Sequence, residues 1–290
     1  MRITVCIPVR FCVCWAVYFI DAGEPTVYQR EVFPNAPLEF VAAEVRFPYS
    51  PKLGRHESFD VLVDALRDVF PIPDREEQRE RAVGPQGVQA AEPQVTYRLL
   101  AKDRLSSVTV GHSRLNLEVT DYQEYPEFRQ LIRRSLEPLD TLGVVVGVER
   151  IGLRFIDEVR VPSVKAASDW RGYIADEFLG PLVLSDEGTV ENLEGIVKMQ
   201  THAETHLVLR YAALDGAGVV GGGPLRRRKP PSSGPFFVID TDSVWQGPEI
   251  MDFDVESVLD VFDQLHEPVG TIFHRTITDR LKNEVLRSNP

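Results

Sequence analysis

Apolar and polar residues alternate along this chain with two different periods, and these periods predict both strands and helices. Over residues 40–47 every second residue is apolar, while Glu44 and Arg46 fall on the other side, as in a strand with one buried face. Over residues 59–70 the apolar residues recur every three or four positions, which predicts an amphipathic helix that ends before Pro71. The first part of the fold is therefore expected to be a strand followed by a helix.

The same two periods continue to the C-terminus. Further strands are expected over residues 95–100, 107–110, 115–119, 144–155, 195–211 and 236–245. Further helices are expected over residues 126–142, 168–179 and a long C-terminal segment, 258–285. Residues 74–93 are charged and then rich in Gly, Ala, Gln and Pro, so we expect them to form a mobile loop.

This order of elements predicts a fold class. Helices that interleave with antiparallel hairpins favour an α+β fold with a mainly antiparallel sheet over a doubly wound parallel sheet. The second half of the chain repeats the theme of the first less clearly, so we expect two similar α+β lobes, residues 27–163 and residues 164–290. Residues 217–235 have low complexity and are expected to form a flexible basic loop in the second lobe.

Charge and cysteine content limit the kinds of partner and cofactor. The formal net charge of −12 argues against binding to nucleic acid or to an anionic membrane, because such surfaces repel an acidic protein. All three cysteines, Cys6, Cys12 and Cys14, lie near the N-terminus, so the rest of the chain has no disulfide framework, thiolate nucleophile or cysteine zinc site. We therefore expect a cytoplasmic protein without a cofactor.

Residues 1–26 differ from the rest of the chain and admit three interpretations. Residues 4–20 are mostly apolar and follow Arg2, as in a secretory signal, but Arg10 interrupts the run and a poor cleavage site follows it. The three interpretations are an over-extended gene start, a signal or membrane anchor, and a true N-terminal strand. We favour the first, with Val27 as the natural start and no association with a membrane.

The most informative segment places arginines inside a pattern that otherwise predicts a buried strand. Arg150, Gly152 and Arg154 share one face of this strand because their separations are even. The glycine leaves a gap between two guanidinium groups, and such a gap can bind a phosphate or a carboxylate of a partner. The alternative, which we favour, is that the arginines pair with acids on neighbouring strands, such as Glu44 and Glu118.

Several short motifs together carry a resemblance to a known family. They are Asn35-Ala36-Pro37-Leu38 before a strand, Tyr122 and Phe128 near the start of a helix, the strand Arg150-Ile151-Gly152-Leu153-Arg154, and His266 followed by Phe273. Over about residues 28–285 the chain resembles a sporadically distributed family of uncharacterised bacterial proteins. Such relatives usually carry an asparagine where this chain has Asp157. Their patchy distribution implies mobile genes, and hence a defence or toxin–antitoxin module.

Two groups of residues are candidate metal ligands. His202, Glu204 and His206 share one face of a strand and are all zinc-binding types, although a strand holds the two imidazoles too far apart for one ion. Asp240 and Asp242 also share a strand face, as paired carboxylates of a metal-dependent nuclease do. Solvent-exposed polar faces and loops are the competing explanation for both groups.

A glycine-rich segment and a basic run complete the candidates. Residues 216–221 match the dinucleotide-binding pattern, but the glycines and proline that follow prevent the helix that this motif requires. Arg226, Arg227, Arg228 and Lys229 then offer the one place where this acidic chain could bind nucleic acid. A solvated, disordered loop is the simpler interpretation of both features.

These candidates do not identify a reaction. We expect a non-catalytic binding or regulatory component, with a protein partner encoded by a neighbouring gene of a mobile defence or toxin–antitoxin module. Its binding residues would be Arg150 and Arg154. The alternative is a metal-dependent hydrolase or nuclease that uses Asp240 and Asp242.

Overall fold

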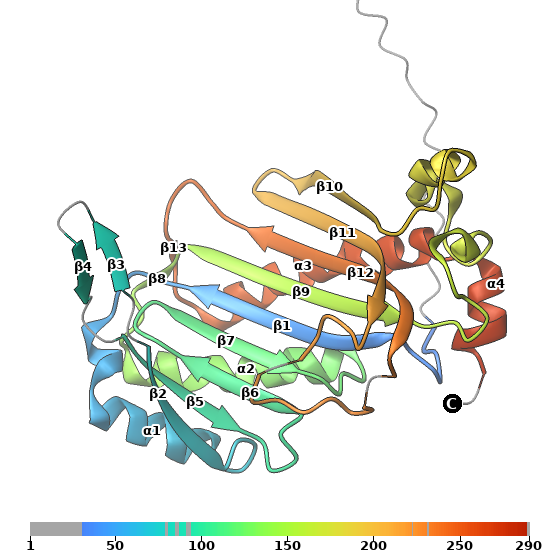
Figure 1. Cartoon of the computed structure of the whole chain (residues 1–290). Helices are drawn as coiled ribbons and strands as arrows, with labels where there is room; N and C mark the ends of the chain where they lie inside the picture. Colours follow the sequence, from blue (N-terminus) through green and yellow to red (C-terminus); the bar gives the residue numbers. More distant parts are fainter. Residues whose placement is uncertain are drawn as a thin grey trace, which may run out of the picture. The chain divides into compact units, whose positions relative to one another are not determined.

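One antiparallel sheet with helices packed on one of its faces forms the α+β fold of this protein (Figure 1). The computed structural model describes residues 31–78, 81–84, 87–90, 94–221, 223–230 and 232–288. The N-terminal extension that was expected over residues 1–26 lies outside the described residues. None of the helices in the described part of the chain combines the length and apolar character needed to span a bilayer.

The sheet has nine strands, and every neighbouring pair is antiparallel. In spatial order these are β10 (Leu193–His202), β11 (Thr205–Gly216), β12 (Gly234–Trp245), β9 (Arg150–Val159), β1 (Leu38–Arg46), β7 (Arg114–Val119), β6 (Ser106–Val110), β5 (Gln94–Leu100) and β2 (Ile72–Gln78). Two short ladders join β8 (Gly147–Val148) to β13 (Met251–Asp252) and β3 (Arg81–Gly84) to β4 (Gly87–Ala90).

The described residues between 74 and 93 lie in strands, which corrects the expectation of a loop there. β2 runs to Gln78 and pairs with β5 as one edge of the sheet, and the β3–β4 hairpin follows it. An edge strand tolerates Pro73 and the exposed Asp74 because one side of its backbone faces solvent. Composition alone therefore gave the wrong assignment for this segment.

Three longer helices cover the sheet. They are α1 (His56–Leu66), α2 (Tyr125–Leu142) and α3 (Val255–Thr276), and Asp254 caps α3 by accepting a hydrogen bond from the Ser257 amide. The long C-terminal helix that the sequence predicted is therefore confirmed, but it ends at Thr276, because the next residue, Ile277, has an extended backbone. The Thr278 side chain then caps a short new helix, α4 (Asp279–Leu281), which continues into η5 (Lys282–Leu286).

The helix expected over residues 168–179 was also wrong. Short 3-10 turns replace it, namely η2 (Ala167–Trp170), η3 (Asp176–Phe178) and η4 (Gly180–Asp186), and η1 (Pro51–Gly54) is a similar turn before α1. Gly172 has a φ of 82°, a left-handed conformation that interrupts a right-handed helix. Trp170 is nonetheless buried in the core, so the apolar pattern reflects burial rather than helical period.

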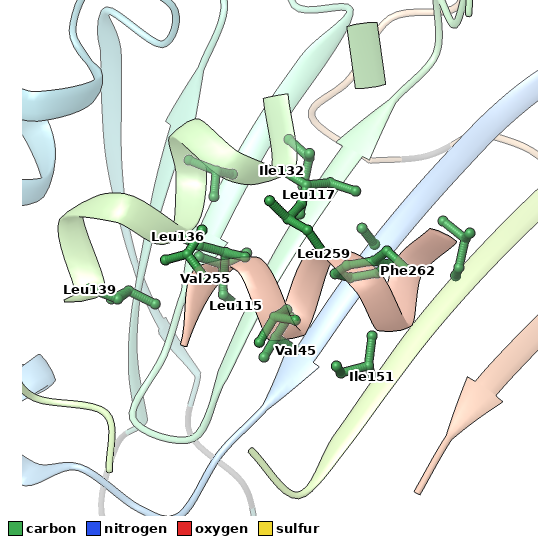
Figure 2. Close-up of a cluster of buried hydrophobic side chains, with 14 of the residues drawn as sticks. Val45, Leu115, Leu117, Ile132, Leu136, Leu139, Ile151, Val255, Leu259 and Phe262 are labelled. Atoms are coloured by element: carbon green, nitrogen blue, oxygen red, sulfur yellow. The ribbon is translucent and has the colours of Figure 1, made fainter. Parts of the chain in front are cut away.

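The main hydrophobic core lies between the sheet and the helices (Figure 2). Val45 of β1, Leu117 of β7 and Ile151 of β9 point toward the helices from alternate positions of their strands. Leu136 of α2 and Leu259 of α3 pack against them. A second cluster continues the core over β11, β12 and the C-terminal helices.

The two halves of the chain have the same order of elements around the central β1–β9 pair. In each half an inner strand is followed by a helical connection, by a meander whose last strand pairs with the inner strand, and by a long helix. An Arg-Phe pair occurs at residues 46–47 and 154–155, and a Glu-Pro pair inside each long helix at residues 137–138 and 267–268. The halves are thus similar in topology.

The two lobes expected on either side of residue 163 nevertheless share this one sheet, and the boundary between them stays a prediction. Residues Val32–Pro290 form one compact unit, because β1 and β9 pair with each other and make a single sheet from both halves. This pairing satisfies the backbone groups of two strands that would otherwise be exposed edges.

The core predicts a large difference between two truncations. Leu259→Ala should lower the free energy of unfolding by about 2–5 kcal/mol, because it leaves a cavity among fully buried side chains. Val183→Ala, at an exposed position of η4, should change it by less than about 0.5 kcal/mol. Urea denaturation of both variants measures this difference, and equal effects would contradict the described core.

Candidate functional site

The face of the sheet opposite the helices carries a patch of charged side chains. The register places Asp242 of β12 opposite Arg154 of β9, and Arg46 of β1 opposite Arg150. Arg210 of β11 lies opposite Asp240 in the next pair of strands. We call the following set the arginine face: Arg46, Arg150, Arg154 and Arg210, with Glu44, Asp240 and Asp242.

Arg154 and Arg210 lie above a buried carboxylate. The Nε and Nη2 atoms of Arg154 each donate a hydrogen bond of 2.7 Å to Asp240, and Arg210 Nη1 lies 3.6 Å from the same carboxylate. The side chain of Asp240 is 8% exposed, whereas those of Arg154 and Arg210 are 44% and 43% exposed. The hydrogen bonds to Asp240 raise the pKa of Arg154 above its ordinary value. The acid thus holds guanidinium groups that still face solvent.

The expected gap beside Gly152 is filled by Arg150. A Cβ atom at Gly152 would lie 3.1 Å from Arg150 Nη1, so the guanidinium crosses directly over the glycine. Arg150 Nη1 donates to Glu44 Oε1, and Arg46 Nε donates to the same oxygen at 2.8 Å. The predicted pairing of Arg150 with Glu44 is therefore confirmed. Glu118 instead accepts a hydrogen bond from Ser107.

The proposed metal ligands do not form a site. His202 ends β10 and His206 lies in β11, so a tight turn separates the residues that were expected to share one strand. Glu204, in that turn, accepts a hydrogen bond of 3.1 Å from the indole of Trp245. No group of three His, Cys, Asp or Glu side chains within the described ranges is arranged to hold a metal ion. Asp240 and Asp242 do share a face, but arginines surround them.

The glycine-rich segment does surround an anion, and this anion is a side chain of the protein itself. The amides of Val219 and Val220 donate to Glu158 Oε1 at 2.8 and 3.0 Å, and Arg227 donates to both carboxylate oxygens. Gly218 has a φ of 125°, and a Cβ atom there would lie 2.5 Å from Glu158 Oε2. Burial raises the pKa of Glu158, but these hydrogen bonds lower it to a net value below the ordinary one.

The described residues of the basic run contact the sheet, and the flexibility expected of this loop stays a prediction. Arg227 is 9% exposed and also pairs with Glu39 at 3.0 Å. Arg228 is 59% exposed and lies 3.2 Å from Asp121. The backbone carbonyl of Arg226 accepts a hydrogen bond from Thr120. Arg227 and Arg228 thus serve internal ion pairs, which weakens the case for a nucleic-acid site here.

Asp157 is an acid on the core side of β9. It is buried between Leu38 of β1 and Ile239 of β12 in the register of the sheet. Burial raises the pKa of Asp157 to about 8, and the nearby charge of Glu39 adds to the shift. A neutral side chain therefore suits this position.

Tyr122, His266 and Asn35, three residues on which the predicted family resemblance rests, make contacts within the fold. Tyr122 packs edge-on against Phe155, with 5.7 Å between ring centroids, and Phe155 in turn lies 5.9 Å from His266. Tyr125 stacks on His266 at 3.7 Å. The side chain of Asn35 donates a hydrogen bond to the carbonyl of Val285. This bond joins the residues just before β1 to η5.

Comparison with known proteins gives no further support for a function. No family model matches the chain, and no curated protein is detectably similar to it. The membership of a bacterial family therefore stays a prediction.

Sequence reasoning missed two sets of ion pairs, one on the arginine face and one around the buried Glu158. Arg210 follows the alternation of β11 and could have been placed beside Asp240 once the hairpin of β11 and β12 was recognised. The pairing of Glu158 and Glu39 with Arg227 had no such signal, because the chain distance between these residues is large.

Asp157 makes stability depend on pH in a defined direction. The unfolded chain releases this proton near pH 4, whereas the folded protein keeps it up to about pH 8, so the contribution of Asp157 to stability falls over this range. Asp157→Asn should therefore raise the free energy of unfolding by about 2–5 kcal/mol at about pH 8.5, and much less at about pH 4.5. Chemical denaturation at both pH values measures the gain.

The matched control is Asp252→Asn, which changes an exposed carboxylate. At about pH 8.5 it should change the free energy of unfolding much less than Asp157→Asn does, because water already solvates an exposed carboxylate. A similar pH profile for the two variants would show that Asp157 is ionised in the folded protein.

Two neighbouring arginines provide a test of the buried ion pairs. Arg227→Ala should lower the free energy of unfolding by about 2–4 kcal/mol, because it removes the closest described cation from the buried Glu158 and leaves Arg160 at 3.6 Å. Arg228→Ala should cost about 1 kcal/mol or less, since its pair is exposed. Thermal and urea unfolding of both variants give the comparison. Equal costs would mean that Arg227 is solvated.

Proposed function

We propose that the protein is a non-catalytic binding component, and that its arginine face binds an acidic region of a protein partner. The observation that carries this proposal is the layering of charge on that face. Asp240 is nearly buried beneath Arg154 and Arg210, and Glu44 is less exposed than Arg46. The guanidinium groups of Arg46, Arg154 and Arg210 are consequently the most exposed charges of this patch.

This layering favours a carboxylate-rich partner. Planar guanidinium groups bind carboxylates with two parallel hydrogen bonds, and those of Arg154 and Arg210 keep donors that face solvent. Asp240 fixes Arg154 in place, so less side-chain entropy is lost when a partner binds. The chain as a whole is strongly acidic, and the arginine face therefore gives an acidic partner one preferred place to approach.

We further propose that the partner is encoded by a neighbouring gene. The resemblance to a sporadically distributed bacterial family supports this, because patchy distribution is typical of mobile defence and toxin–antitoxin modules. A hydrolase that uses Asp240 and Asp242 has less support, because arginines rather than metal ligands surround these carboxylates.

Co-expression with the product of the adjacent gene tests the proposal. The two proteins should co-purify at low salt, and Arg210→Ala should weaken binding about tenfold or more, while leaving the melting temperature unchanged. Arg210 suits the test because it is half-exposed and Asp240 keeps Arg154 as its main partner.

Arg67→Ala is the matched control, since Arg67 is exposed beside α1 on the helix side of the sheet. It should bind as wild type does. Equal binding by Arg210→Ala and wild type would rule out the arginine face as the binding surface, and failure of wild type to bind the adjacent gene's product would refute the proposed partner.

A further inference from the structure

β10 forms one edge of the nine-stranded sheet. Among the described strands, β10 pairs with β11 alone, and Figure 1 shows it at the edge opposite β2. The strand is 10 residues long, Leu193–His202. The backbone N–H and C=O groups on the outer side of an edge strand are free to pair with another strand.

The two edges of the sheet are protected to different degrees. β2 carries Pro73 and the exposed Asp74, and proline and exposed charges are common features that prevent pairing between edges. β10 has no proline, and two neighbouring apolar side chains are open to solvent, Ile196 at 71% and Val197 at 40%. An edge of this length and composition is suited to pair with another strand.

We propose that a second copy of this chain pairs with β10, antiparallel and centred on Ile196. A two-fold axis at this residue places Ile196 opposite Ile196 of the other copy. The same axis places Glu194 of each copy opposite Lys198 of the other, which gives two opposite-charge pairs. The strand is thus complementary to itself in charge and in apolar content.

The register with β11 supports this arrangement. Glu194, Ile196 and Lys198 lie opposite Ala212, Arg210 and Val208, respectively, so all three point to the same face of the sheet as the arginine face. Glu194 and Lys198 are both exposed there. Centring the axis on the next residue, Val197, would instead place Ile196 opposite Lys198 and would lose both charge pairs.

The resulting dimer has one continuous sheet whose two outer edges are the β2 strands. Backbone hydrogen bonds between the copies would remove the unprotected edges, and the apolar pair at Ile196 would be covered. The two arginine faces would lie on the same side of the joined sheet, although the dimer does not depend on the function proposed for them.

Charge reversal at the two complementary positions tests this register. Wild type should sediment as a dimer at about 100 µM, whereas Glu194→Lys and Lys198→Glu should each weaken the dimer about tenfold or more, because two like-charge pairs replace two attractive ones. The double variant Glu194→Lys/Lys198→Glu restores both pairs with their signs exchanged and should dimerise nearly as well as wild type. Sedimentation equilibrium gives the dissociation constants.

Asp74→Lys, at the other edge, is the control and should leave the dissociation constant unchanged. Circular dichroism of each variant verifies that the fold is retained, as expected for substitutions at exposed positions. A monomeric wild type would overturn the proposal. A double variant as weak as the single variants would overturn it as well, since no other feature of the chain predicts mutual rescue by these two charges.

Discussion

The antiparallel pairing of β1 with β9 is the interaction on which the rest of the structure depends. It joins the two halves of the chain into one sheet and fixes which residues share a face. Val45 and Ile151 consequently face the same core, while Glu44 and Arg150 meet on the opposite side. A shift of one residue would exchange these faces and bury the charges, so core packing and charge pairing specify the same register.

Charges on this protein occupy two kinds of environment with different consequences. On the arginine face, acids lie beneath arginines that remain in contact with solvent, so the ion pairs leave donors for a partner. At the other end of β9, Glu158 is buried and Arg227 is 9% exposed, and their pairing holds Val219, Val220 and Arg227 against the sheet. The first arrangement leaves guanidinium donors available to a partner. The second stabilises the position of the glycine-rich connection after β11.

The two edge strands of the sheet, β2 and β10, also differ in composition. Pro73 and the exposed Asp74 disfavour pairing of β2 with another strand, whereas β10 presents the exposed apolar side chains of Ile196 and Val197. A partner on the arginine face and a second copy at β10 would use adjacent surfaces, because Arg210 lies directly opposite Ile196 in the β10–β11 register. Association at the edge would therefore extend the same surface that we propose for binding.

The sequence by itself determined the fold class and the alternation of strands such as β1 and β9, because the two-residue period is a local property. It also indicated that Arg150 could pair with Glu44. Tertiary structure alone decided that both halves share one sheet, that Arg154 binds Asp240, and that Glu158 occupies the glycine-rich loop. These contacts join residues far apart in the chain, and their energies depend on burial and register, which no local pattern records.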